Sequence, residues 1–331
     1  MLDNEPVMPP PVFQDRKTLL VVFGILQIFM AAIIFVLLIF IGIASAANSN
    51  RSSVTANAMR VMTPIFLFYG TLIIWFIWMG IGSIKARRWA RALTLASSWL
   101  WLIFGVIATV VISLSIPQAV TKMYDGEEIA PIFILITKII IGVIVLVFYI
   151  LIPGMFISVY RRRNIKMTCE LYDRQIRWTD QCPLPVLALV LLFGFAALYL
   201  LGMLSYARVA PFFGFLLGGV RGIIILLIMA AVSGYLAWGL FRLDIRSWWV
   251  TFLFVILVSI STALTFYKVG FKGVYFAMLF PEQLKFVKQF MYPKSAFEAF
   301  YGIWGIPIVG YLWFVRKYFV GQKKRDYSRV L

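Results

Sequence analysis

Histidine is absent from this 331-residue chain. A chain without an imidazole cannot build a Ser-His-Asp or Cys-His nucleophilic site, a histidine general base, a histidine-ligated haem or the usual imidazole zinc sites. Cysteine is almost as scarce, because Cys169 and Cys182 are the only two. We expect both to be free thiols in a segment facing the reducing cytosol, since two cysteines are too few for a disulfide scaffold. The sequence therefore predicts no catalytic residues, no cofactor and no metal ion.

Charged side chains are also few, at 13% of the residues, while 63% are hydrophobic and the mean hydropathy is +0.94. A soluble domain carries about a quarter of its residues as Asp, Glu, Lys and Arg. The composition therefore predicts an integral membrane protein. The charges are unbalanced as well, with a net charge of +18. Because the Lys and Arg residues lie at the edges of apolar stretches, we interpret this excess as a membrane-topology signal and expect no nucleic acid partner.

Eight stretches of the chain contain no Asp, Glu, Lys or Arg. A helix needs about 20 residues to cross a hydrocarbon core of about 30 Å. The sequence thus predicts an all-α, polytopic bundle of eight transmembrane helices. The first stretch is about twice as long as the apolar part of a secretory signal peptide, which favours an uncleaved helix. The stretches are residues 18–46, 61–84, 92–116, 139–160, 183–206, 222–241, 247–267 and 299–315.

The segments that join these stretches differ in positive charge. On one side of the predicted bundle they carry 20 of the 31 Lys and Arg residues. Short cytoplasmic loops are the ones enriched in Lys and Arg. We therefore expect a multi-pass protein of a bacterial-type plasma (inner) membrane, with its N-terminus and C-terminus in the cytoplasm. The basic segments are residues 1–17, 85–91, 161–182, 242–246 and 316–331.

The second half of the chain faintly repeats the first half. Gly80 and Trp89 correspond to Gly239 and Trp248, each pair separated by 159 residues. Four helices per half give two parallel units, because an even number of crossings returns the chain to the same side. The predicted organisation is a cytoplasmic tail (1–17), a first four-helix repeat (18–165), a second four-helix repeat (166–320) that includes an outer loop (268–298), and a basic cytoplasmic tail (321–331).

Two cations, Lys138 and Arg221, interrupt longer apolar runs. An ionisable residue inside a membrane span is a candidate for function. The repeat instead assigns both residues to the outer ends of equivalent helices. We interpret them as anchors whose side chains reach the interface, and a role inside a cavity is the alternative.

The segment from Gly80 to Arg91 reads Gly-Ile-Gly-Ser-Ile-Lys-Ala-Arg-Arg-Trp-Ala-Arg. It resembles a cytoplasmic turn found in uncharacterised bacterial multi-pass membrane proteins built from four helices. The second half keeps the glycine, one arginine and the tryptophan, but departs from the pattern at Ser247 and Trp249. The resemblance implies a membrane fold and no particular activity.

The candidate for an intramembrane polar site lies on the stretch 247–267. Ser261, Thr262 and Thr265 share one helical face, and Gln27 of the first helix is the residue we expect to join them. In the alternative interpretation these side chains bond to the carbonyl four residues earlier or hold neighbouring helices together.

Basic residues beside the cytoplasmic membrane ends are candidate contacts for anionic lipids, where each cation gains about 1 kcal/mol. Simple anchoring is the alternative. We expect residues 161–182 to form an ordinary solvated loop. Residues 281–291 are predicted to form an amphipathic helix that covers either the outer leaflet or the bundle. The candidate lipid contacts are Lys85, Arg87, Arg88, Arg91, Arg161, Arg162 and Arg163.

Three functions are compatible with such a bundle. The first is a non-enzymatic scaffold or accessory subunit of a membrane complex, favoured because neither catalytic groups nor midplane charges are predicted. The second is a transporter of a small neutral or amphipathic solute, with a cavity between the repeats. The third is an enzyme that acts on lipids through loop carboxylates, although the acidic cluster of Asp125, Glu127 and Glu128 is more typical of a solvated turn.

Overall fold

The computed structural model describes residues 14–49, 55–123, 131–204, 209–278 and 305–330. These residues are helical apart from short connections and one two-stranded hairpin, which confirms the all-α prediction. The elements are α1 (Lys17–Ser49), α2 (Thr55–Ile84), α3 (Arg88–Met123), α4 (Pro131–Leu146), the π-helical segment η1 (Val147–Leu151), α5 (Ile152–Tyr160), α6 (Arg163–Tyr172), the 3-10 turn η2 (Trp178–Gln181), α7 (Leu184–Met203), β1 (Ala210–Phe212), β2 (Phe215–Leu217), α8 (Gly219–Phe241), α9 (Ile245–Met278) and α12 (Gly305–Val330).

Seven helical spans of the described chain are long and apolar enough to cross a membrane. They lie in α1, α2, α3, the continuous run from α4 through η1 to α5, α7, α8 and α9. Between 6% and 33% of each span is buried, so most of its side chains are exposed or half-buried, as expected for helices that face lipid. These helices indicate a multi-pass membrane protein. The eighth predicted stretch, 299–315, is described only from Gly305, where α12 begins.

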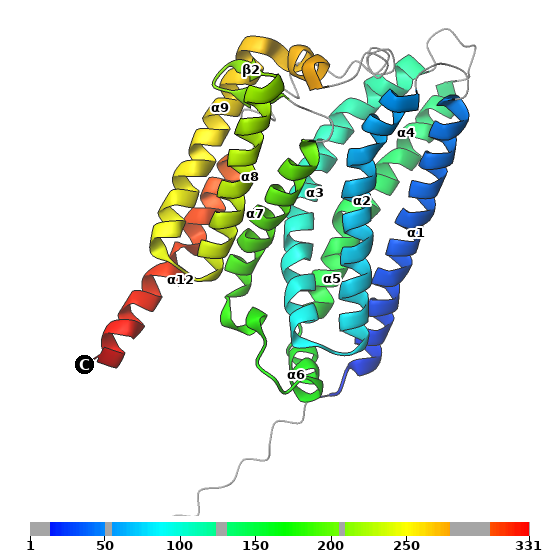
Figure 1. The fold of residues 1–331 in the computed structure, drawn as a ribbon. Coiled ribbons are helices and arrows are strands. Elements are labelled where there is room, and N and C mark those ends of the chain that lie inside the picture. Colours follow the sequence, from blue (N-terminus) through cyan, green and yellow to red (C-terminus); the bar gives the residue numbers. More distant parts are fainter. Residues whose placement is uncertain (1–13, 50–54, 124–130, 205–208, 279–304, 331) are drawn as a thin grey trace, which may run out of the picture.

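The helices form two groups that meet along α3 and α7 (Figure 1). Helices α1 and α2 pack closely against each other, and so do α7 and α8. Helix α3 contacts α2, α4, α5 and α7, while α12 packs on α9 and α7. Figure 1 shows α6 at one end of the bundle and the β1–β2 hairpin at the opposite end. The end that carries α6 is called the basic end below, because the turns there contain the Arg87 and Arg161 to Arg163 clusters.

The buried side chains concentrate toward the basic end, in two cores. In α1, the described side chains beyond Ala31 are exposed or half-buried, so the buried side chains of this helix lie in its first half. The first core joins α1, α3, α5 and α6 through residues that include Leu20, Phe23, Leu95, Phe156, Tyr160 and Ile165. The second core joins α2, α3, α7, α8, α9 and α12 through residues that include Met79, Leu93, Leu187, Leu240, Trp248 and Leu312.

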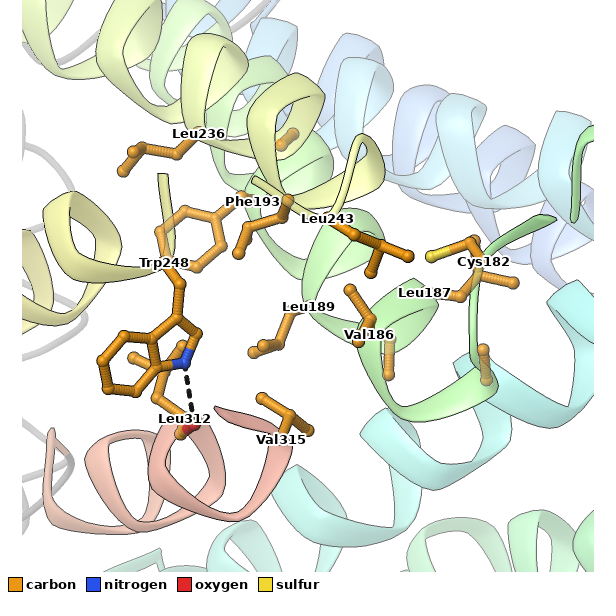
Figure 2. Packing of buried hydrophobic residues seen from close by; sticks show 14 of the residues in the cluster. Cys182, Val186, Leu187, Leu189, Phe193, Leu236, Leu243, Trp248, Leu312 and Val315 are labelled. Carbon is orange, nitrogen blue, oxygen red and sulfur yellow. Dashed lines mark hydrogen bonds between the residues drawn. The ribbon is translucent and has the colours of Figure 1, made fainter. Parts of the chain in front are cut away.

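Trp248 lies in the second core and is fully buried. Its indole N–H donates a hydrogen bond to the carbonyl of Leu312 over 3.0 Å, which joins α9 to α12 (Figure 2). Phe193 of α7 and Leu236 of α8 belong to the same buried core as Trp248. A buried indole usually requires such a partner for its N–H. This hydrogen bond therefore helps to hold α12 against α9.

Two turns at the basic end have the same backbone hydrogen bonds. In the α2–α3 turn the amide of Arg87 donates to the carbonyl of Gly82, over 2.9 Å. In the α8–α9 turn the amide of Asp244 donates to the carbonyl of Gly239, over 3.3 Å. The residue before each donor has a left-handed backbone, with φ of 49° at Ala86 and 57° in the second turn. The two turns thus share one conformation at positions that are 157 residues apart.

This offset differs from the predicted register of 159 residues. Gly239 corresponds in conformation to Gly82, because a Cβ on either glycine would collide with the small residue eight positions later, Ala90 or Ser247. Gly80 serves another contact, since a Cβ there would lie 2.7 Å from the carbonyl oxygen of Gly24 in α1.

Several helices extend beyond their predicted ends. Helix α9 is assigned to Met278 but is broken by a kink at Gly270, where φ is +74°, so residues 268–278 are helical on both sides of this glycine rather than part of a loop. The predicted amphipathic segment 281–291 and the acidic cluster at 125–128 lie outside the described residues.

Lys138 lies within α4, not at its first turn, because α4 begins at Pro131. The 22 residues from Lys138 to Tyr160 rise about 33 Å, which covers a hydrocarbon core of about 30 Å. An interfacial position for Lys138 therefore remains compatible with the longer helix. Arg221 is exposed and lies in the first turn of α8, at the end of that helix.

Candidate functional site

Gln27 belongs to a buried polar cluster inside the first group of helices. Its side chain is 2% exposed, and its amide nitrogen donates to the Oγ1 of Thr94 over 3.3 Å. The hydroxyl of Ser83 donates to the Oε1 of Gln27 over 3.4 Å, and the hydroxyl of Tyr160 donates to Ser83 over 2.8 Å. The cluster links α1, α2, α3 and α5. It acts as polar glue between helices, because its members bond to one another.

Ser261 and Thr265 lie far along the chain in α9 and hold the β1–β2 hairpin. The amide of Phe213 donates to Ser261 Oγ over 2.9 Å, and the amide of Gly214 donates to Thr265 Oγ1 over 3.0 Å. The Thr265 hydroxyl itself donates to the Ser261 carbonyl, four residues earlier. Gly214 has φ of +87°, a conformation that favours glycine. These hydroxyls therefore satisfy the backbone of a tight turn.

The predicted polar site does not form as a single face. Gln27 bonds within the first group of helices, whereas Ser261 and Thr265 bond to the hairpin, and Thr262 is half-buried beside them. The alternative interpretation, in which these residues serve packing, matches the contacts found. Sequence reasoning missed the hairpin, whose signal is a glycine between aromatic residues at 212–215.

A charged cluster at the basic end surrounds Asp173, which is 2% exposed. Arg177 Nη2 lies 2.9 Å and Arg87 Nη1 3.5 Å from its Oδ1. The backbone N–H of Arg88 donates to its Oδ2 over 3.3 Å. Burial alone would raise the pKa of Asp173, but these hydrogen bonds and charges outweigh it and hold the pKa below its ordinary value. Asp173 therefore ties the α2–α3 turn to the segment after α6.

The prediction of an ordinary solvated loop at 161–182 is wrong. This segment contains α6, whose Ile165 is buried in the first core, and Thr168 accepts a hydrogen bond from the Arg16 amide over 3.0 Å. Cys169 and Cys182 are free thiols, as predicted, and both are buried. Burial raises the pKa of each thiol to about 12. Apolar residues at helical spacing in α6 explain why the segment folds onto the bundle.

The seven candidate lipid contacts differ in how far their charge is available to lipid. Arg87 and Arg88 form ion pairs with Asp173 and Asp180, the second at 3.8 Å, so part of their charge is used within the protein. Arg91 is half-buried. The remaining four, Lys85, Arg161, Arg162 and Arg163, are exposed.

An apolar groove of about 580 Å³ lies between the two groups of helices. Its floor is α7, and its walls are α2 on one side and α8 on the other. Thr71 is its one hydroxyl-bearing residue, and that hydroxyl already donates to the Leu67 carbonyl over 2.7 Å. We name it the aromatic groove, because its lining includes Trp75, Trp78, Trp178, Phe195, Trp238 and Phe241.

Comparison of the chain with protein-family models, with curated proteins and with solved structures gives no match. The function therefore has to be argued from the geometry of these clusters and of the aromatic groove.

Proposed function

We propose that the protein is a non-enzymatic scaffold or accessory subunit of a membrane complex. The buried polar groups support this proposal, because the hydroxyls and amides of Gln27, Ser83, Ser261 and Thr265 are used in holding helices and the hairpin together. A site that binds a solute or performs chemistry needs polar groups directed at a ligand. The polar groups of these four residues are instead directed at the protein itself.

The proposal includes eight crossings arranged as two tandem four-helix repeats. Three observations support it: the matching turns at Gly82 and Gly239, the close pairs α1–α2 and α7–α8, and the packing of α12 on α9 through Trp248. In this arrangement α12 forms the eighth crossing. The resemblance of residues 80–91 to turns of bacterial four-helix membrane proteins accords with it.

The basic end faces the cytoplasm of a bacterial-type plasma membrane in this proposal. Figure 1 shows that α1 begins and α12 ends at the same end as α6. The positive-inside rule then assigns that end to the cytoplasm. Fusion of a periplasmically active reporter after residue 50 and after residue 331 tests it. We expect activity from the first fusion only, and activity from both would refute the orientation.

Purification from native membranes in a mild detergent tests the scaffold proposal. We expect a second membrane protein to co-purify at constant stoichiometry through two affinity steps and size exclusion. Tyr267, which is 88% exposed on α9, is a suitable site for a photo-crosslinking amino acid that would capture the partner. The same amino acid at the buried Thr265 is the control, because a cross-linker at a buried position should not capture a partner at the surface. A chain that runs alone and cross-links to no protein would refute the proposal.

A transporter of a small neutral or amphipathic solute is the second candidate. The aromatic groove favours it, because the groove lies between the two proposed repeats, where duplicated bundles bind their substrates. The variant Gly194→Cys separates the two functions. A transport path makes this thiol reactive toward a membrane-impermeant maleimide, whereas a lipid-facing groove in a scaffold leaves it unreactive. In inside-out membrane vesicles, where the basic end faces the reagent, Lys85→Cys is the positive control.

A further inference from the structure

We infer that the aromatic groove binds one acyl chain of an anionic glycerophospholipid, whose phosphate lies against Arg242 and Lys85 at the basic end. This inference does not depend on the scaffold proposal, because a bound lipid is compatible with either function.

The shape of the groove fits a hydrocarbon chain. Its floor on α7 runs from Val190 to Leu198, which is about 12 Å at 1.5 Å per residue. Gly194 lies in the middle of this floor, and a Cβ built there meets no atom within 4 Å. The glycine therefore leaves the centre of the groove open. A volume of about 580 Å³ is within the range of small-ligand sites.

The lining favours an apolar occupant. Trp75 of one wall packs edge-on against Phe195 of the floor, with ring centroids 5.0 Å apart. Because the Thr71 hydroxyl is already bonded, a polar ligand would lose its hydration without gaining partners from it. A hydrocarbon chain has no hydrogen bonds to water to lose when it enters the groove, and the aromatic rings provide apolar surface for it to contact.

Two cations of the protein lie at the end of the groove where the phosphate of a bound phospholipid would be. Each wall helix is followed directly by a cation, Lys85 after α2 and Arg242 after α8. Both side chains are exposed, and the Arg242 guanidinium lies 3.9 Å from the centroid of Trp238, a groove residue. In the corresponding turns these two cations occupy equivalent positions, 157 residues apart. An anionic headgroup between them would be attracted from both sides of the groove.

The short length of the groove and its end near the membrane interface favour a lipid over a partner helix as the occupant. The rings of Trp178 and Phe241 both line the groove, and Trp178 belongs to η2, outside the membrane spans. A transmembrane helix requires a contact surface that continues for about 30 Å. A floor of about 12 Å that ends at the interface next to two cations instead matches one chain and its headgroup.

Lipid counting on the full-length protein tests the inference. The delipidated protein in detergent is titrated with phosphatidylglycerol or with phosphatidylcholine, and native mass spectrometry counts the bound molecules. We expect one high-affinity site that prefers phosphatidylglycerol. Gly194→Leu should remove this site, because its side chain fills the groove. Arg242→Gln should lower the preference for phosphatidylglycerol about fivefold, the effect of one cation at an anionic surface.

Gly142→Leu is the matched control. Gly142 is a span glycine of α4 with no atom within 4 Å of its built Cβ, but it does not line the groove, so the site should persist. An unchanged lipid count in Gly194→Leu would overturn the inference. So would the loss of a co-purifying protein in Gly194→Leu with lipid retained, since the occupant would then be a partner helix. A missing partner protein in the wild type affects only the scaffold proposal.

Discussion

The α2–α3 turn and the α8–α9 turn have one backbone conformation but different partners. In the first turn Arg87 pairs with the buried Asp173, and Ser83 joins the Gln27 cluster. At the equivalent positions of the second turn stand Asp244 and Leu240. Asp244 is exposed and accepts a hydrogen bond from an amide at the start of its own helix, whereas Leu240 is buried in the second core.

The difference shows how a repeated turn takes different roles. Close packing of glycine against a small residue sets the backbone in both turns. The side chains then decide what the turn binds. The first turn is tied to the segment after α6 by charge and has a polar cluster beneath it. The second has an apolar core beneath it and presents its charges to the surroundings.

The largest expected effect is the loss of Asp173. Asp173→Ala leaves the Arg88 amide and two guanidinium groups without their carboxylate, and we expect unfolding to become easier by about 2–3 kcal/mol. This is below the value for a fully buried pair, because the Arg87 and Arg177 side chains are 39% and 30% exposed. Asp244→Ala in the second turn should cost about 1 kcal/mol, the value of a helix cap. Denaturant unfolding in micelles measures both, and equal losses would contradict the comparison.

Alanine at the turn glycines should have the next largest effect. Gly82→Ala and Gly239→Ala each place a Cβ against a neighbouring side chain, and we expect each to destabilise the protein by about 1–2 kcal/mol. Gly194→Ala is the control, because its Cβ meets open space and alanine favours the helix. The same unfolding assay applies. If Gly82 tolerates alanine and Gly239 does not, the two turns are not equivalent.

Removal of one hydroxyl from the polar cluster should cost less. Tyr160→Phe deletes the 2.8 Å hydrogen bond to Ser83 and should lower the free energy of unfolding by about 1 kcal/mol. Tyr235→Phe, on the exposed face of α8, should have no measurable effect. Thermal unfolding of both variants beside the wild type provides the measurement, and an unchanged Tyr160→Phe would mean that the cluster contributes nothing.

The smallest expected effect is that of pH on the melting temperature. Near neutral pH the Asp173 carboxylate is fully ionised, so a change of pH there alters nothing, and the effect is confined to acid solution. The folded pKa of Asp173 lies below its unfolded value, which is about 3.9. Its contribution to stability is therefore complete above that value and is lost as the pH falls through the folded pKa. We expect the melting temperature of the wild type to drop more between pH 6 and pH 3 than that of Asp173→Asn. Parallel curves for the two proteins would show that another group controls the acid response.

Hydropathy and charge were sufficient to predict the helical spans. An apolar stretch of about 20 residues forms a helix in lipid because its backbone has no other way to satisfy its hydrogen bonds. The absence of charge from such stretches is visible without any tertiary contact, and seven of the spans are present in the described chain. The prediction that both cysteines are free thiols is also confirmed, and it rested only on there being two of them.

The partners of polar residues could not be predicted in this way. Gln27 and the Ser261–Thr265 face are both polar positions in apolar helices, and nothing local separates them into two clusters. The folded α6 was missed because its segment is rich in charge, although Ile165 and Cys169 carry an apolar face. The aromatic groove draws its walls from α2 and α8, which are far apart along the chain.

Local chemistry thus accounts for the long apolar helices of this chain and for which of their ends carry positive charge. It does so because transfer into lipid depends on each segment separately. The pairing of Asp173 with Arg87, the register of the two turns and the opening beside Gly194 depend on which segments meet in space. Those contacts are short in range and join residues distant in sequence, so they exist only once the helices have packed.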